Sequence, residues 1–180
     1  MPVYFTVDQY LATPETNRPR EVAYGVLREP PAPYVAHQFV VTHLGALLDA
    51  HVRSHDLGWV AVSPIDVILD RERALVVQPD IVFVAAGRID LVRNQVWGAP
   101  DLVVEVLSRG TARRDRTVKL RWYRQYGVHE CWLVDPARRT LTVIDFAGGA
   151  RPRRRTYRGG AAVRSAVLPR IRLTATEVLA

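Results

Sequence analysis

The feature that most constrains the fold is the run of strand-forming residues from 100 to 108, Pro-Asp-Leu-Val-Val-Glu-Val-Leu-Ser. The run has no helical period and is apolar on both faces, which is typical of a strand in a sheet covered by helices. Glu105 nevertheless lies in its middle. An unpaired carboxylate in such a place is costly or shifts its pKa until it is neutral. Glu105 is therefore expected to lie beside a cation, and the rest of the sequence must indicate which one.

Length and composition favour one ordinary globular domain spanning residues 1–180. Hydrophobic residues make up 48% and charged residues 24% of the 180 positions, as in typical globular proteins. No apolar run approaches the roughly 18 residues that cross a bilayer, and the N-terminus lacks the plan of a signal peptide. The single cysteine, Cys131, excludes an internal disulfide framework. We expect a cytoplasmic protein with no membrane partner.

The basic residues carry two signals. The net charge of +7 favours an anionic partner such as nucleic acid, although an arginine-rich proteome would give the same excess. Among the 25 basic residues only Lys119 is a lysine. Lysine differs from arginine as a compact ammonium that can give up a proton. Lys119 is therefore expected to be present for its amine, if its location supports this.

Periodicity and turn residues predict a chain that contains both helices and strands, of the α/β class, with a β-rich portion between residues 59 and 84. Helices are expected over residues 5–11, with Thr6 as the cap, and over 34–56, 111–126 and 174–179. Strands are expected over two halves of 20–28, and over 59–62, 66–69, 75–77, 80–84, 100–108, 130–135 and 140–146.

Three residues converge on one kind of chemistry. Asp80 opens a strand, Glu105 lies inside the central strand, and Lys119 lies on the helix that follows. If the two strands are neighbours, both carboxylates can face one cavity and Lys119 can lean over it. Alternation along the central strand puts Asp101 on the same face as Glu105.

This set of groups is suited to phosphodiester hydrolysis. Two carboxylates plus water suit a hard divalent cation such as Mg²⁺. Such an ion polarises a phosphoryl oxygen and lowers the pKa of a bound water. A nearby lysine can orient or deprotonate that water, or stabilise charge that builds on the phosphorus centre.

The same residues carry a family resemblance. The chain resembles the PD-(D/E)XK nuclease superfamily, and more closely its Uma-type restriction endonucleases. The matching segments are residues 21–25 (Glu-Val-Ala-Tyr-Gly), 64–67 (Pro-Ile-Asp-Val), 78–81 (Gln-Pro-Asp-Ile), 100–108, the trio Asp115, Lys119 and Tyr123, 127–132 (Gly-Val-His-Glu-Cys-Trp) and 134–136 (Val-Asp-Pro). They follow the family order over nearly the whole chain.

The resemblance implies a restriction-endonuclease-like core, a mixed β-sheet flanked by α-helices. It implies that Asp80 and Glu105 are ligands of Mg²⁺ or Mn²⁺, that Lys119 is the catalytic lysine and that Glu21 is an accessory acid. The sequence departs from the standard motif in one place. The superfamily lysine lies two residues after the acid, where this chain has Leu107. We interpret Lys119 as that lysine, supplied from the adjacent helix.

The resulting hypothesis is a Mg²⁺-dependent endonuclease acting on DNA. Asp80 and Glu105, with a backbone carbonyl of the central strand, would hold the metal, and Lys119 would handle the attacking water. Lys119→Ala and Asp80→Ala are expected to fold normally and to lose cleavage. The alternative is a catalytically silent module of the same fold that binds nucleic acid or a protein partner. A homodimer is compatible with cutting both strands, because that requires two sites.

Each candidate also has a purely structural interpretation. Glu105 could pair with an arginine, Asp80 could cap a strand, and Lys119 could form an i, i+4 pair with Asp115. Glu21 could be an exposed hairpin glutamate.

Other candidates are weaker. Asp101 and Asp115 are candidates for a supporting role beside the site. Arg153, Arg154 and Arg155 could follow a phosphate backbone with Tyr157 stacking on a base, or could form a solvated hairpin. His51 and His55 have metal-ligand spacing but no third ligand, which favours a solvated helix face.

Overall fold

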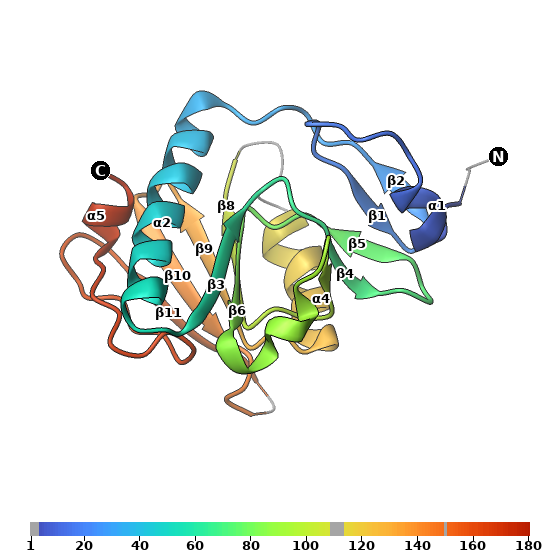
Figure 1. Ribbon diagram of the computed structural model, residues 1–180. Helices are drawn as coiled ribbons and strands as arrows, with labels where there is room; N and C mark the ends of the chain where they lie inside the picture. Colours follow the sequence, from blue (N-terminus) through green and yellow to red (C-terminus); the bar gives the residue numbers. More distant parts are fainter. Residues whose placement is uncertain (1–3, 109–113, 150) are drawn as a thin grey trace.

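The larger of two sheets forms the centre of the molecule (Figure 1). The computed structural model describes residues 4–108, 114–149 and 151–180. The strand order is β11-β10-β9-β8-β6-β3, with β8 parallel to β9 and the other pairs antiparallel. Its strands are β3 (Gly58–Val62), β6 (Ile81–Ala85), β8 (Leu102–Val106), β9 (Glu130–Asp135), β10 (Thr140–Asp145) and β11 (Arg153–Tyr157). The predicted central strand is β8, and every residue of it is buried.

The smaller sheet has the order β2-β1-β5-β4-β7, and it too is mixed because β4 and β7 are parallel. Its strands are β1 (Glu21–Ala23), β2 (Val26–Arg28), β4 (Val67–Asp70), β5 (Leu75–Val77) and β7 (Val96–Trp97). Helix α1 (Val7–Leu11) begins at Thr6, whose side chain accepts a hydrogen bond from the Gln9 amide. Val7 and Tyr10 of this helix pack on the apolar face of the small sheet.

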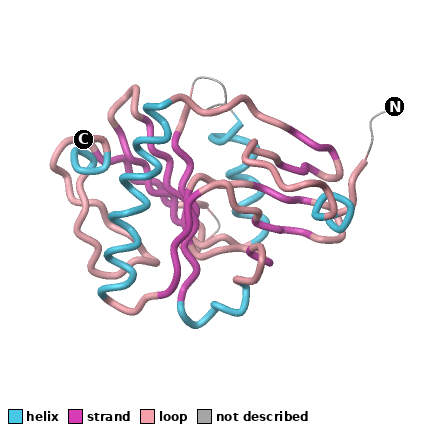
Figure 2. The backbone as a smooth tube through the Cα atoms, turned by 45° about the horizontal axis from the view of Figure 1, so that its top comes forward, coloured by secondary structure: helices cyan, strands magenta, loops and turns pink. Residues whose placement is uncertain are grey.

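Helices cover both faces of the larger sheet (Figure 2). Helix α2 (Val35–Ser54) and the short α5 (Ala175–Val178) cover one face, and a π-helical turn η2 (Asp115–Lys119) leading into α4 (Leu120–Tyr126) covers the other. A row of apolar residues at three- and four-residue steps buries α2 against the sheet, namely Val41, Leu44, Leu48 and Val52. Gly127 ends α4 in the left-handed conformation, with φ of 91°.

The structure confirms the main sequence predictions for helices and strands, and it adds the edge strand β11 and two further elements. One of these is the 3-10 helix η1, which covers Ala86–Leu91. The two-residue strand β7 was not predicted, because its length gives no periodic pattern. The first part of the helix predicted at 111–126, residues 111–113, lies outside the described residues. Within the described ranges, no helix is long and apolar enough to cross a membrane.

The packing of α2 on the sheet should dominate stability. Leu48 is fully buried, whereas Val35 on the same helix is 87% exposed. We expect Leu48→Ala to lower the free energy of unfolding by about 2–5 kcal/mol, and Val35→Ala to change it by less than about 0.5 kcal/mol. Urea unfolding followed by circular dichroism measures both. Equal losses in the two variants would contradict this account of the core.

Candidate active site

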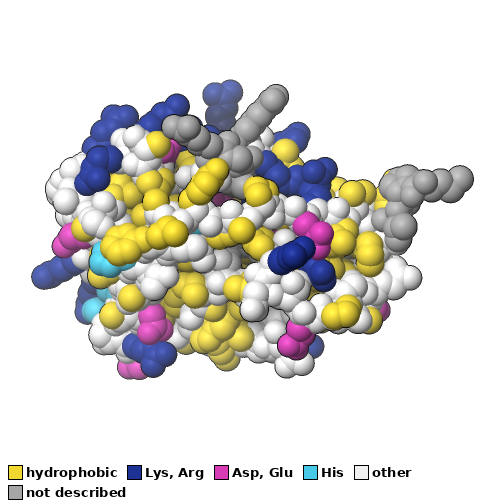
Figure 3. Space-filling model, turned by 90° about the horizontal axis from the view of Figure 1, so that it is seen from above, with side chains coloured by type: hydrophobic (Ala, Val, Ile, Leu, Met, Phe, Trp, Pro, Cys, Tyr) yellow, Lys and Arg dark blue, Asp and Glu magenta, His cyan; other side chains and the backbone are white. Residues whose placement is uncertain are grey.

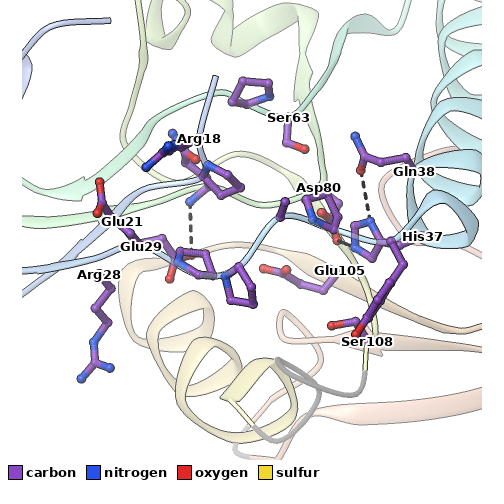
Figure 4. Close-up of a pocket in the computed structure, with 18 of the residues that line it drawn as sticks. Arg18, Glu21, Arg28, Glu29, His37, Gln38, Ser63, Asp80, Glu105 and Ser108 are labelled. Carbon is purple, nitrogen blue, oxygen red and sulfur yellow. Dashed lines mark hydrogen bonds and ion pairs between the residues drawn. The ribbon is translucent and has the colours of Figure 1, made fainter. Parts of the chain in front are cut away.

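The acidic residues of interest gather where the chain crosses between the two sheets. Residues 63–66 and 78–80 connect strands of one sheet to strands of the other. A cavity of about 1150 Å³ opens at this junction (Figure 4). Glu21, Asp80, Glu105 and Lys119 all line it. The structure thus brings the three residues of the predicted constellation, and Glu21, to one place.

Strand register puts Asp80 opposite Glu105. Strands β6 and β8 are antiparallel, with Ile81 opposite Val104 and Val82 opposite Val103. Asp80 directly precedes β6, and continuing this register by one residue would bring it opposite Glu105, with both side chains on one face. Directly opposed residues of antiparallel strands have Cβ atoms about 4.5–5.5 Å apart. Figure 4 shows both carboxyl groups at the cavity.

Glu105 is 3% exposed and is compensated by groups from the helix that follows its strand. The Lys119 ammonium donates hydrogen bonds to its Oε1 at 3.0 Å and its Oε2 at 3.1 Å. The Tyr123 hydroxyl donates a short hydrogen bond to Oε1. Burial, together with the charge and hydrogen bond of Glu105, raises the pKa of Tyr123 well above 10, so the hydroxyl stays a donor. The cation that Glu105 requires within the protein is therefore Lys119.

Glu21 is the second carboxylate on Lys119. Its Oε1 lies 2.8 Å from the Lys119 ammonium, and its Oε2 accepts a hydrogen bond of 3.3 Å from Arg114. The amide of Gln78 also donates to Glu21, at 3.4 Å. Burial by itself would raise the pKa of Glu21, but the charges of Lys119 and Arg114 outweigh it and hold the pKa below its ordinary value of 4.5. Glu21 is 6% exposed, so it is not the exposed hairpin glutamate considered above.

Asp80 has different partners. Its Oδ2 accepts a hydrogen bond of 2.7 Å from the Val106 amide and lies 3.3 Å from Nε2 of His37. Burial disfavours the charged imidazolium of His37, but the hydrogen bond with Asp80 and the charge of Asp80 outweigh this and raise the pKa of His37 above 6.5. Asp80 is therefore held by the backbone of β8 on one side and by the first turn of α2 on the other.

The residues present fit a hard divalent cation. Asp80 and Glu105 offer carboxylate oxygens from adjacent strands on one wall of a cavity, and Mg²⁺ binds through one or two carboxylates while keeping several waters. No group of three or more His, Cys, Asp or Glu side chains among the described residues is arranged to hold a metal ion. Two carboxylates would thus need a backbone carbonyl, water or substrate oxygens to complete the coordination.

Comparisons with known proteins assign the chain to a family. The family model described as "Putative restriction endonuclease", Uma2, matches residues 7–176. The chain belongs to the Uma2 family. The crystal structure of a "putative nuclease belonging to DUF820" from Anabaena variabilis superposes with a TM-score of 0.80, covers 97% of each chain and shares 19% identity. The Uma2 chain therefore has the restriction-endonuclease-like fold. None of the curated proteins matches it.

Several predicted residues of the Uma2 chain do not join the cavity. Asp101 is at the other end of β8, where it accepts hydrogen bonds from Arg88 at 2.9 Å and from the Ala85 amide at 2.8 Å. It lies four positions before Glu105, which is about 13 Å along a strand. Asp101 thus anchors the far end of β8. The side chain of Asp115 lies outside the described part of the chain, and so does its pairing with Lys119.

One prediction about the basic segment of the Uma2 chain, residues 153–157, is wrong. Arg153, Arg154 and Arg155 are exposed on the edge strand β11, as a phosphate-binding or a solvated strand would require. Tyr157 was expected to be available for stacking, but it is 9% exposed and packs in the core with Val163 and Leu168. The C-terminal segment covers its ring, so Tyr157 cannot stack on a base.

Two residues of the Uma2 site were missed from the sequence. His37 contacts Asp80, and Arg114 contacts Glu21. His37 lies four residues before Val41, so it extends the buried apolar row of α2. A histidine within an otherwise apolar row of a helix was the feature of the sequence that could have identified His37 as a site residue. Arg114 is one of many arginines and carried no signal.

The structure also corrects the expectation that Lys119→Ala folds normally. Lys119 is 5% exposed and pairs with both Glu21 and Glu105. Removing one member of a buried ion cluster leaves uncompensated charge and costs about 3–5 kcal/mol. Lys119→Ala would therefore lose activity and stability together, and isosteric changes at the carboxylates are the cleaner tests.

The depressed pKa of Glu21 predicts a pH dependence of stability in the Uma2 chain. A carboxylate with a lower pKa in the folded state stabilises the fold above its unfolded pKa, and this contribution is lost as the pH falls through the folded value. Glu21→Gln should therefore lower the free energy of unfolding at pH 7, and its deficit relative to wild type should shrink below about pH 4.5.

Urea unfolding at a series of pH values measures this deficit. Glu72→Gln, at an exposed glutamate, is the matched control and should follow the wild type at every pH. A deficit that stays constant or grows on acidification would contradict the electrostatic role of Glu21.

Proposed function

We propose that this protein is a divalent-metal-dependent endonuclease that hydrolyses phosphodiester bonds of DNA. One observation carries the proposal: Asp80 and Glu105 project from adjacent strands to one face, and the ammonium of Lys119 lies 3.0 Å from Glu105 at the wall of the same cavity. Membership of a restriction-endonuclease family supports it.

The two carboxylates are assigned to the metal. Asp80 and Glu105, with a backbone carbonyl of β8, would hold Mg²⁺ or Mn²⁺. When bound, such an ion polarises a phosphoryl oxygen and lowers the pKa of a coordinated water. The hydrogen bond from the Val106 amide fixes one oxygen of Asp80, and Lys119 and Tyr123 fix the orientation of Glu105. The protein thus prearranges both carboxylates.

Lys119 is assigned to the water and the developing charge. Its ammonium lies between Glu21 and Glu105 and lines the cavity. From there it can orient the attacking water and stabilise negative charge on the phosphoryl oxygens, as a positioned donor does in general acid–base and electrostatic catalysis. Glu21 holds the ammonium from the opposite side, which makes it a positioning residue.

The assignment of DNA as the substrate is based on the positive charge of the protein. The chain carries a net charge of +7, and Arg18, Arg28 and Arg114 line the cavity that holds the acids. Arginine side chains there would bind phosphates on either side of the scissile bond. A homodimer stays a prediction that depends on whether both strands of a duplex are cut.

A second function is favoured by a specific observation. Lys119 and Arg114 together balance the charges of Glu21 and Glu105, so the ion cluster is a complete structural unit without a metal. A catalytically silent module that binds nucleic acid or a protein partner would have the same cluster. Its DNA binding would depend on salt and would survive loss of the carboxylates.

Cleavage is the direct test. Purified protein with Mg²⁺ or Mn²⁺ should cut circular single-stranded or plasmid DNA, and EDTA should stop it. Asp80→Asn keeps the shape of the side chain and removes its charge, so we expect normal thermal unfolding and a loss of at least about 100-fold in rate. Asp90→Asn, at an exposed aspartate, should cut like the wild type. A wild type that cuts neither DNA nor RNA would count against the proposal.

Metal titration separates the enzyme from the silent module. Isothermal titration calorimetry with Mn²⁺ should detect binding to the wild type that is lost in Glu105→Gln, provided circular dichroism shows both folded. Binding in neither protein, with salt-sensitive DNA binding retained in both, would favour the module.

A further inference from the structure

A proline-rich connector forms one wall of the cavity. Residues 29–34, Glu-Pro-Pro-Ala-Pro-Tyr, join β2 to α2, and we call them the strap. Its three prolines favour an extended, stiff backbone. Its ends are tied down, because Arg20 donates a hydrogen bond of 2.9 Å to Glu29 and Tyr34 is the N-cap of α2. The strap is therefore a stiff connector, joined at one end to β2 and at the other to α2, that lines the cavity.

The strap lies across the cavity from the acids. All six of its residues line the same cavity as Asp80, Glu105 and Lys119. Figure 1 shows the connector running from the small sheet to α2 over the side of the molecule where β8 ends. A substrate that reaches Glu105 thus has protein on two sides, the sheet junction beneath it and the strap beside it.

This enclosure limits the shape of the substrate. Glu105 and Lys119 are almost fully buried, so a scissile phosphate must enter the cavity. A phosphate of an intact duplex lies on a wide rod next to a second strand, so a cavity that the strap bounds favours a single strand over that rod. The cavity of about 1150 Å³ is slightly above the roughly 300–1,000 Å³ of pockets that enclose a drug-sized ligand. That volume suits a few nucleotides of one strand.

An exposed aromatic residue, Tyr34, lies in the lining of the cavity, where an unpaired base could stack on it. Tyr34 lines the cavity, yet its ring is 74% exposed. An exposed aromatic ring in a cavity that arginines also line is a typical platform for an unpaired base, and bases in a duplex are stacked on each other and cannot use it. Figure 3 looks onto this side, with hydrophobic side chains across the middle and Lys and Arg around them.

We propose that the site takes an unpaired strand of DNA, such as a single strand or a flap, with one base stacked on Tyr34. The choice of substrate rests on the proposed function, but binding can be tested without cleavage. The proposal also removes the need for two sites, because only one strand is engaged.

Fluorescence anisotropy of Asp80→Asn in EDTA tests the binding. The probes are a labelled 20-nucleotide single strand and the same sequence as a blunt duplex. We expect the single strand to bind at least about tenfold more tightly. Adding Tyr34→Ala should weaken single-strand binding about tenfold, and Tyr34→Phe should retain it, because the ring and not the hydroxyl stacks. Tyr4→Ala, at a 64% exposed tyrosine outside the cavity lining, is the control and should bind like the parent.

Equal or tighter binding of the duplex would overturn the proposal, and so would unchanged single-strand binding in Tyr34→Ala. Cleavage by the wild type with Mn²⁺ is then measured on the single strand, the blunt duplex and a duplex with a single-stranded flap. Faster cutting of the unpaired regions supports the inference, and equal cutting of the blunt duplex contradicts it. Selective single-strand binding without any cutting would overturn the proposed nuclease function and leave the binding inference standing.

Discussion

The buried ion cluster around Glu105 is the constraint on which the site depends. A carboxylate inside the central sheet requires a cation, and Lys119 meets this need from the helix that follows the strand. Because the same ammonium also pairs with Glu21, one lysine ties strand β1 of the small sheet to strand β8 of the large one. Buried ion pairs of this kind are costly to break and add little net stability. Under the proposed function, this ion cluster holds the carboxylates at the cavity.

The junction of the two sheets turns this cluster into a site. The chain crosses between the sheets just before β6, and Asp80 lies at that crossing, opposite Glu105 in register. A second acid thereby reaches the same face without being buried in the sheet itself. The strap and the first turn of α2, with His37 on Asp80, complete the walls. The same elements that place the acids therefore also form the walls of the cavity around them.

The sequence predicted local structure better than the contacts between distant segments. The apolar run around Glu105 predicted β8, and the uniqueness of Lys119 pointed to its amine. Alternation gave the face of Glu105, but the pairing of β6 with β8 is a long-range contact that no local pattern encodes. For the same reason His37 was missed, and Tyr157 was assigned to the surface although a distant C-terminal segment covers it.

The central claim is that Asp80 and Glu105 share one cation at the sheet junction. Crystals of the wild type grown with Mn²⁺ test it most directly, through an anomalous difference map collected near the manganese absorption edge. The account predicts a peak between the two carboxylates, within about 2.0–2.6 Å of an oxygen of each, as for oxygen-ligated divalent cations. A map with no peak there at saturating Mn²⁺, or with its peak on other side chains, would contradict it.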